Sequence, residues 1–161
     1  MIKPNTTIYA LAASLTICLA EGAEEKVSLE EIPAAAAKTL KEQAGGEKIK
    51  SLSKEKDEGK TVYEASFSKK GRAHDVTVDE KGKLISDEEV IPLAEAPDAV
   101  RAAIEKEHPG GKVDKIEKIT EGHNISYEAL ISAKGKREEI KFDDKGKVLE
   151  REDKTGIKGN D

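Results

Sequence analysis

Hydrophobic and polar residues alternate in two similar stretches of the chain. The first reads Tyr-Glu-Ala-Ser-Phe over residues 63–67, and the second reads Ile-Ser-Tyr-Glu-Ala over residues 125–129. A period of two is typical of a strand that buries one face and leaves the other in water. The pattern therefore predicts that Tyr63 and Tyr127 lie in the core, and that the glutamate after each of them points to an open, polar face.

The same alternation returns a few residues later in each stretch. Residues 75–79 read Asp-Val-Thr-Val-Asp, and residues 139–143 read Glu-Ile-Lys-Phe-Asp. Turns that contain glycine precede and follow these strands, which predicts antiparallel hairpins. The predicted turns are residues 69–71, 79–82, 133–135 and 143–146. An earlier strand in each stretch, near residues 48–55 and 112–119, has its apolar residues three apart, and we expect a bulge there.

A short helix is predicted ahead of the strands in each stretch. Ser28 and Glu31 have capping-box spacing, Pro33 suits a first helical turn, and apolar residues then recur at helical spacing until two glycines stop the pattern. The second stretch repeats this order between Pro97 and Pro109. The two apolar stripes are Ala36, Ala37, Leu40 and Ala44, and then Val100, Ala103 and Ile104.

The two stretches are copies of one unit. Sliding the sequence by 64 positions (97 minus 33) places Pro33 on Pro97 and the Tyr-Glu-Ala motifs on each other. We therefore predict an α+β fold of two tandem α-β-β-β-β repeats, in which each antiparallel sheet has its helix packed on one face and its other face open. The predicted divisions are a first repeat at 27–91, a second repeat at 92–153 and a flexible tail at 154–161. Residues 90–96, which join the repeats, are expected to lie against the protein.

Residues 1–20 have the pattern of a signal peptide. Lys3 precedes a charge-free apolar run, and Cys18 and Ala20 place small residues before a cleavage point at Glu21. The run is shorter than the ~20 residues of a membrane-spanning helix. We expect export to the periplasm or medium of a bacterium, with no membrane attachment after cleavage. A lipoprotein signal at Cys18 remains the alternative, although Ile17 is bulky for such a site.

Composition limits both the core and the partners. Charged residues make up 38% of the chain, hydrophobic residues 36% and aromatic residues 3%, which predicts a thin, two-layer structure with a modest core. The net charge of -5 comes from interspersed charges of both signs, whereas a nucleic-acid binder needs a basic face. Cleavage would also remove the only cysteine, so a mature chain from Glu21 would have no disulfide and no thiolate ligand.

The chemistry-bearing residues form no recognisable catalytic, cofactor or metal site. His74, His108 and His123 are not spaced as metal ligands or as part of a catalytic triad. The Asp-x-Lys-Gly turns at 79–82 and 143–146 suggest calcium only superficially, because a lysine would stand inside each site. We predict that the protein is not an enzyme, holds no cofactor and does not bind nucleic acid. A small periplasmic enzyme would instead require a concave pocket with convergent polar groups.

These motifs resemble the bacterial PepSY-like domain, and their tandem arrangement is similar to β-lactamase-inhibitor-protein-like (BLIP-like) members of that family. The resemblance rests on the helix opened by Pro33, the Tyr-Glu-Ala strand from Tyr63, and the Val-Thr-Val-Asp-Glu-Lys-Gly segment at 76–82, all repeated in the second copy. It implies a periplasmic or secreted, non-enzymatic module, some relatives of which inhibit an enzyme by laying the open sheet face over it.

The open sheet face is thus the candidate binding surface for a protein or peptide partner. The alternatives are a face that is merely solvated, and a periplasmic inhibitor of a secreted hydrolase of the peptidase or β-lactamase type. Tight interfaces rely on Trp, Tyr and Arg anchors, yet the chain has no Trp, and Tyr63 and Tyr127 are expected to point inward. The candidate face consists of Glu64, Ser66, Asp75, Thr77, Glu128, Glu139 and Lys141.

Overall fold

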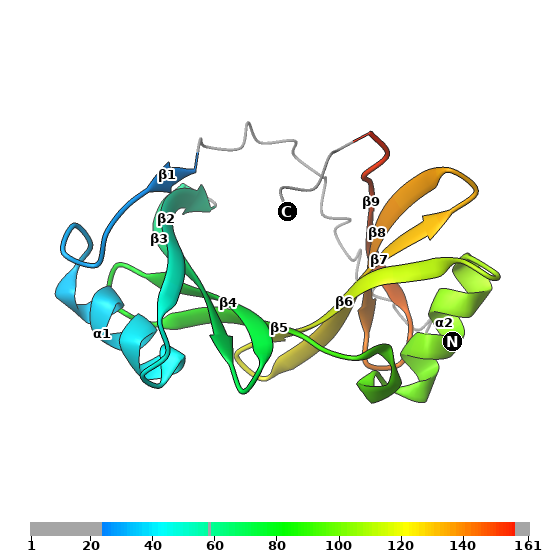
Figure 1. Ribbon diagram of the computed structural model, residues 1–161, viewed down its shortest axis with the longest axis horizontal. Helices are drawn as coiled ribbons and strands as arrows, with labels where there is room; N and C mark the ends of the chain where they lie inside the picture. The colour runs from blue at the N-terminus through cyan, green and yellow to red at the C-terminus, as the bar shows by residue number, and fades with distance from the viewer. Residues whose placement is uncertain (1–23, 58, 157–161) are drawn as a thin grey trace, which may run out of the picture.

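The computed structural model describes residues 24–57 and 59–156. Within these residues the chain forms one antiparallel sheet of nine strands and two α-helices (Figure 1). The predicted signal peptide lies outside the described residues. Strand β1 (Glu25–Lys26) precedes the first repeat, which contains α1 (Ala34–Ala44), β2 (Ile49–Asp57), β3 (Lys60–Lys69), β4 (Arg72–Asp79) and β5 (Leu84–Val90). The second contains a short 3-10 helix (Leu93–Glu95), α2 (Asp98–Glu107), β6 (Lys112–Glu121), β7 (Asn124–Ala133), β8 (Lys136–Asp143) and β9 (Val148–Asp153).

The strands follow one another across the sheet in chain order, and every neighbouring pair is antiparallel. The two repeats are joined edge to edge, because β5 pairs with β6 from Asp87 opposite Thr120 to Val90 opposite Glu117. The predicted bulges are confirmed, since the register of β2 against β3 shifts between Ile49 and Ser51, and β6 shifts against β7 between Val113 and Lys115. The predicted α+β repeats therefore share a single sheet.

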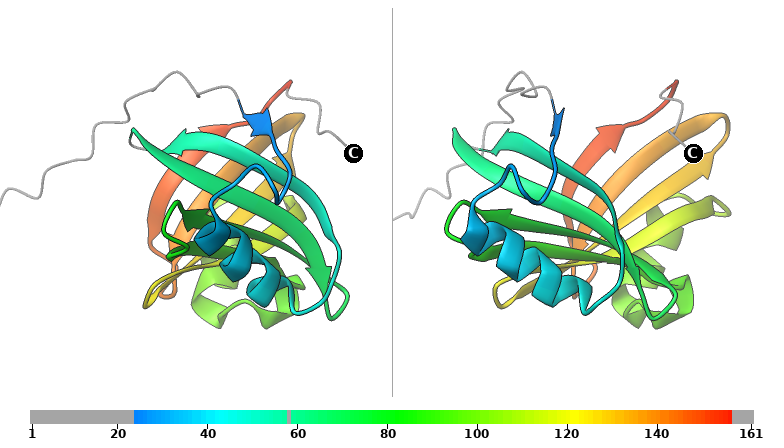
Figure 2. Two further views of the ribbon diagram at one scale, coloured as in Figure 1. Left: turned by 90° about the vertical axis from the view of Figure 1, so that its left-hand side faces the viewer. Right: turned by 60° about the vertical axis from the view of Figure 1, so that its left-hand side comes forward.

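Both helices lie on the outer, convex side of the bent sheet, and within the described residues no helix covers the opposite, concave face (Figures 1 and 2). Helix α1 packs on β3 and β4. Each helix covers a separate hydrophobic core, and the two cores share no residue. The prediction of helices on one face and an open second face is confirmed.

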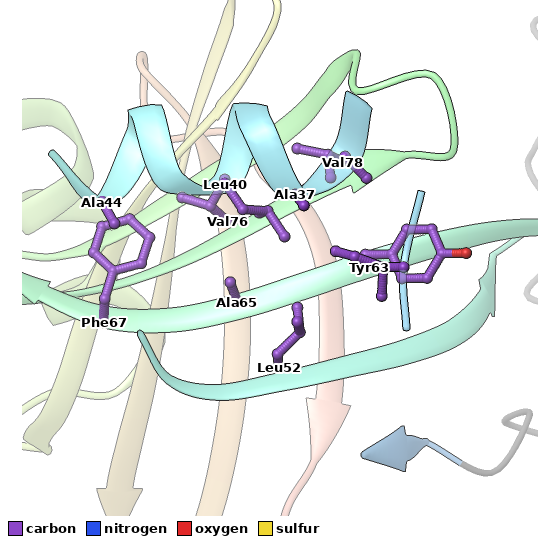
Figure 3. Close-up of a cluster of buried hydrophobic side chains, with 11 residues drawn as sticks. Ala37, Leu40, Ala44, Leu52, Tyr63, Ala65, Phe67, Val76 and Val78 are labelled. Atoms are coloured by element: carbon purple, nitrogen blue, oxygen red, sulfur yellow. The ribbon is translucent and has the colours of Figure 1, made fainter. Parts of the chain in front are cut away.

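The two tyrosines lie in these cores, as strand alternation predicts. Tyr63 is 5% exposed and Tyr127 8%. Tyr63 packs in one cluster with Leu40 and Val78, and Figure 3 shows its ring near the N-terminal end of α1. Tyr127 belongs to the equivalent cluster under α2 with Ile104. The register of both central strands is therefore fixed, and the glutamate after each tyrosine is on the concave side.

Helix α1 begins later than the capping-box spacing suggests. The Glu31 carboxylate accepts the Ser28 backbone N–H at 2.7 Å, but this contact closes a turn ahead of the helix. Pro33 occupies the N-cap, with an extended ψ of 137°, and the first helical residue is Ala34. A proline has no N–H and suits a position where that donor would have no helical partner. Residues 28–31 thus orient the chain toward the helix without capping it.

The linker lies against the protein, as predicted. Ile91 is buried in the second core, and its N–H donates to the carbonyl oxygen of Ile116 at 3.0 Å. Arg72 holds the linker from the other side, because its guanidinium donates to Glu89 at 2.8 Å and to Glu95 at 2.7 Å. The repeats are therefore fastened to each other by the strand pair and by this ion-pair bridge.

Candidate partner-binding face

All seven residues of the predicted binding surface lie on the concave face. In the first repeat Glu64 stands opposite Thr77, and Ser66 stands opposite Asp75, across β3 and β4. In the second repeat Glu128 stands opposite Lys141, and Glu139 lies two positions before Lys141 on the same strand. Residues directly opposite each other, and residues two apart on one strand, share a face. The structure therefore brings the predicted residues onto one surface that runs across both repeats.

Two further glutamates join this surface at the boundary between the repeats. Glu88 of β5 stands opposite Asp75, and Glu117 of β6 stands opposite Glu128. Sequence reasoning missed them because Ser86 to Glu89 contains no apolar residue to mark a face, and because the pairing of β5 with β6 is not encoded in a local pattern. The local sequence could have placed Glu117, because its neighbour Ile116 is apolar and buried, and adjacent residues of a strand point to opposite faces.

We call the row of carboxylates along the middle of the concave face the acidic floor. Five consecutive strands, β3 to β7, each contribute one member. The acidic floor consists of Glu64, Asp75, Glu88, Glu117 and Glu128. These carboxyls lie close enough together to shift one another's pKa, which carboxyls on a fully solvated face would not do.

Burial and mutual repulsion raise the pKa of three floor glutamates to about 7. For Glu64, Glu88 and Glu128 the loss of hydration is the largest cause. Neighbouring carboxylates add to it: chiefly Asp75 for Glu64, and Glu117 for Glu88. Both effects favour the neutral acid, because an ionised carboxylate loses water and meets like charge. The middle of the open face is thus a half-buried row of mutually repelling carboxyls, unlike the merely solvated face that was the alternative.

Glu117 is the most deeply buried member of the floor, at 3% exposure, and it has a cationic partner. Lys115 places its Nζ 2.8 Å from Glu117 Oε2. Burial lowers the pKa of Lys115, but the hydrogen bond and charge of Glu117 outweigh it and the pKa is raised overall. Lys141 is the other cation at the floor, and its charge lowers the pKa of Glu88 and Glu128 in part. Two lysines thus face five carboxyl groups.

Three other polar side chains, those of Asp79, Asp143 and His74, make contacts within turns or beside a core. Asp79 Oδ1 accepts the backbone N–H groups of Lys81 and Lys83 at 2.9 and 2.8 Å, and Asp143 binds its own turn in the same way. These carboxylates therefore act in the turns. His74 Nδ1 lies 2.9 Å from Asp87 Oδ1, and its ring stacks on Phe67.

No cluster of metal-ligating side chains is assembled in the part of the chain that the structure describes. Within residues 24–57 and 59–156, no group of three or more His, Cys, Asp or Glu side chains is placed to hold a metal ion. A hollow of about 960 Å³ opens in the second repeat between His123, Lys141 and Glu150. Its lining mixes Ile125 and Leu149 with scattered polar residues, which do not converge as a nucleophile, a base and an oxyanion donor would.

The two repeats match two related family models. Residues 26–88 match "Peptidase propeptide and YPEB domain", and residues 87–150 match "Putative beta-lactamase-inhibitor-like, PepSY-like". The boundary between the matches falls at β5, where the repeats join. Each of the two repeats thus matches a PepSY-type domain model, as the motifs of the two copies indicate. A search of curated proteins finds no match.

Solved structures with the same architecture come from Bacteroides. A protein from Bacteroides eggerthii, provisionally assigned to the periplasm, is 19% identical, with a TM-score of 0.65 over 77% of this chain and 90% of that one. A DUF2874 family protein from Bacteroides uniformis is also 19% identical, with a TM-score of 0.65 over 78% and 92%. A BLIP-like protein from Bacteroides fragilis is 19% identical, with a TM-score of 0.60 over 81% and 90%. At these identities the likeness establishes the shared fold.

In the described residues no helix has the length and apolar character needed to cross a lipid bilayer.

Proposed function

We propose that this protein is an exported, non-enzymatic binding module that holds a cationic segment of a partner protein on its concave face. The observation that carries the proposal is the acidic floor: five carboxyl groups from five neighbouring strands, on a face that none of the described helices covers. A lysine or arginine side chain laid along this row would relieve the repulsion between the carboxylates. Charge complementarity of this kind selects partners and accelerates encounter.

The geometry suits an extended segment better than a small molecule. The acidic floor crosses five strands, and neighbouring strands lie about 4.8 Å apart, so its ends are on the order of 19 Å apart along the sheet. A single row of carboxyls on a bent sheet is complementary to an extended segment that carries several cationic side chains along its length. A compact ligand would contact only one or two of the carboxyl groups.

Export is part of the same proposal. The sequence of residues 1–20 has the pattern of a signal peptide, and a related structure from Bacteroides eggerthii is provisionally assigned to the periplasm. Inhibition of a hydrolase, the other function that the family resemblance implies, finds less support on this face. Its central residues are carboxylates and lysines, whereas the two core tyrosines point to the opposite side.

The proposal is tested by titrating the mature protein with a fluorescent peptide of alternating lysine and glycine. The floor variant replaces Glu64, Glu88 and Glu128 with glutamine. A matched control replaces three exposed glutamates in turns, Glu30→Gln, Glu47→Gln and Glu80→Gln, which changes the net charge equally. We expect the floor variant to bind at least about tenfold more weakly at pH 8, while the control binds as the unmodified protein does.

The pH dependence provides a second readout. Three floor glutamates have a pKa of about 7, so the floor is more negative at pH 8 than at pH 5.5. Binding of the cationic peptide should therefore tighten as the pH rises through 7, and the floor variant should lose most of this dependence. Equal affinities of the floor and control variants would overturn the proposal.

A further inference from the structure

The strand pairing that joins the two repeats also occurs at the start of the sheet. Ile91 N–H donates to the carbonyl of Ile116 at 3.0 Å, and Val27 N–H donates to the carbonyl of Leu52, also at 3.0 Å. These pairs are related by the same 64-residue shift (91 minus 27, and 116 minus 52). Strand β1 therefore lies on β2 as the end of β5 lies on β6. The first long strand of each repeat receives an incoming strand at the same place.

Strand β9 is the repeat equivalent of β5, but its outer edge has no neighbouring strand within the described residues. Lys154 N–H donates to the Arg137 carbonyl at 2.9 Å, so Lys154 and alternate residues before it are bonded toward β8. The backbone N–H and C=O groups of Arg151 and Asp153 consequently point outward. They occupy the positions from which Asp87 and Glu89 of β5 hold β6. The outer edge of β9 thus has the same backbone arrangement as the edge of β5 that pairs with β6.

We propose that the outer edge of β9 is a docking site for an extended strand of a partner protein, which pairs antiparallel with β9 as β6 pairs with β5. Such strand addition obtains its affinity from backbone hydrogen bonds and its selectivity from the side chains opposite the edge. The proposal is independent of the cationic segment proposed for the concave face, because it rests on the repeat geometry and on a different surface.

The side chains of β9 define the chemistry of the incoming strand. In the register of β5 against β6, a strand with the sequence of β6 would place Lys118 opposite Asp153 and Glu117 opposite Lys154. It would also set the apolar Ile119 opposite Glu152. Both charged pairs are attractive. The expected occupant therefore carries a cation opposite Asp153, an anion opposite Lys154 and no acid opposite Glu152.

A second copy of this chain, added head to tail, does not fit the edge. Its β2 would place Glu55 opposite Glu152 and Lys56 opposite Arg151, and like charges directly opposite each other are unfavourable. Its β1 also already covers part of that β2 strand. The charges of β9 thus prevent the sheet from continuing into another copy while permitting a strand with the pattern of β6.

The test uses two peptides that the chain itself provides. One peptide has the sequence of residues 112–121, from β6, and the matched control has the sequence of residues 48–57, which includes β2. Both are acetylated and amidated, and each is titrated into the full mature protein labelled with ¹⁵N. We expect the β6 peptide to bind at least about tenfold more tightly, because both of its charged pairs with β9 attract. The control keeps one attractive pair, Lys54 with Asp153, but adds the two like-charge pairs of Glu55 and Lys56. The shifted amide signals should be those of Arg151, Asp153 and their neighbours.

Methylation of single peptide nitrogens distinguishes strand pairing from charge attraction alone. In the expected register the N–H of the peptide position equivalent to Lys118 points toward β9, and that of Ile119 points away. Methylation at Lys118 should abolish binding, and methylation at Ile119 should leave it within about twofold. Absence of binding, equal binding of both peptides, or shifts centred on β5 would overturn the proposal. In that event the charges of β9 serve only to protect an edge.

Discussion

The half-buried carboxyls of the acidic floor oppose folding when they are ionised. A glutamate has a pKa of 4.5 in an unfolded chain, whereas that of Glu88 is about 7 in the fold. Between these values the folded state binds more protons than the unfolded state. Stability therefore decreases as the pH rises from about 4.5 to about 7, and it stays low above that. Carboxyls with a lowered pKa, such as Glu107, act in the opposite sense but only at more acidic pH.

Replacing Glu88 with glutamine should stabilise the protein at neutral and alkaline pH. Glutamine resembles the neutral acid, so it removes the repulsion from Glu117, Glu64 and Asp75 without removing bulk. One pKa unit corresponds to about 1.4 kcal/mol, and partial hydration reduces this effect, so we expect a gain of about 1 kcal/mol at pH 8. At pH 5, close to the pKa of the unfolded chain, most of this difference from the unmodified protein should disappear. Urea denaturation at both pH values measures it.

The control for this prediction is Glu80→Gln, which removes an exposed turn carboxylate. Histidine contacts such as His74 with Asp87 are present in every variant, so the difference between variants isolates Glu88. Glu88 is also reached by the charge of Lys141, which works against the gain. A Glu88→Gln protein that is less stable than the unmodified one at pH 8 would contradict the assigned repulsion.

At the scale of single elements, local sequence predicted most of the structure. Strict alternation placed Tyr63 and Tyr127 in the cores, and the spacing of apolar residues revealed both bulges. The hairpin turn before β4 followed from its glycine, since Lys70 and Gly71 both have positive φ, at 52° and 80°. The predicted start of α1 was too early, because the Ser28 backbone N–H and the Glu31 carboxylate form their hydrogen bond in a turn that precedes the helix. Capping motifs indicate a local hydrogen bond, and the helix itself need not follow directly.

The turn between β4 and β5 touches α1 so closely that only glycine fits. Gly82 has φ of +76°, and a Cβ there would lie 2.5 Å from the carbonyl oxygen of Ala35 in the helix. Gly71 has nearly the same φ, +80°, but open space around it. The Gly82 carbonyl also accepts a hydrogen bond from Thr39 Oγ1 at 2.8 Å. The turn and the helix therefore hold each other at a fixed distance.

Alanine substitutions at these two glycines separate backbone strain from crowding. Gly71→Ala should cost about 1 kcal/mol, the price of a side chain in the left-handed region. Gly82→Ala carries the same strain and also pushes the turn off α1, so we expect a loss of about 3 kcal/mol. Guanidinium denaturation of both variants measures the difference. Equal losses of stability in the two variants would mean that α1 moves away from residue 82 at no cost in free energy.

At the scale of the whole molecule, the union of the two sheets was beyond local prediction. The pairing of β5 with β6 joins segments separated by the linker and α2, and residues 84–90 show no alternation that marks a face. The repeat predicted two similar units, but not the edge at which they meet. Glu88 and Glu117 came together only through that pairing, so the acidic floor could be predicted at its ends and not at its centre.

The edge-to-edge union predicts how a single repeat behaves alone. A fragment of residues 24–91 contains α1, β1 to β5 and the complete first core, because the two cores share no residue. It loses the hydrogen bonds to β6 and the bridge from Arg72 to Glu95, and it exposes the whole edge of β5. A single core of this size rarely supplies more than about 3–5 kcal/mol, so we expect a marginal fold that unfolds at lower urea than the full mature chain. The open edge should also cause concentration-dependent association, which sedimentation velocity detects. A monomeric fragment as stable as the whole chain would show that the repeats are independent domains and that the β5–β6 pair only positions them.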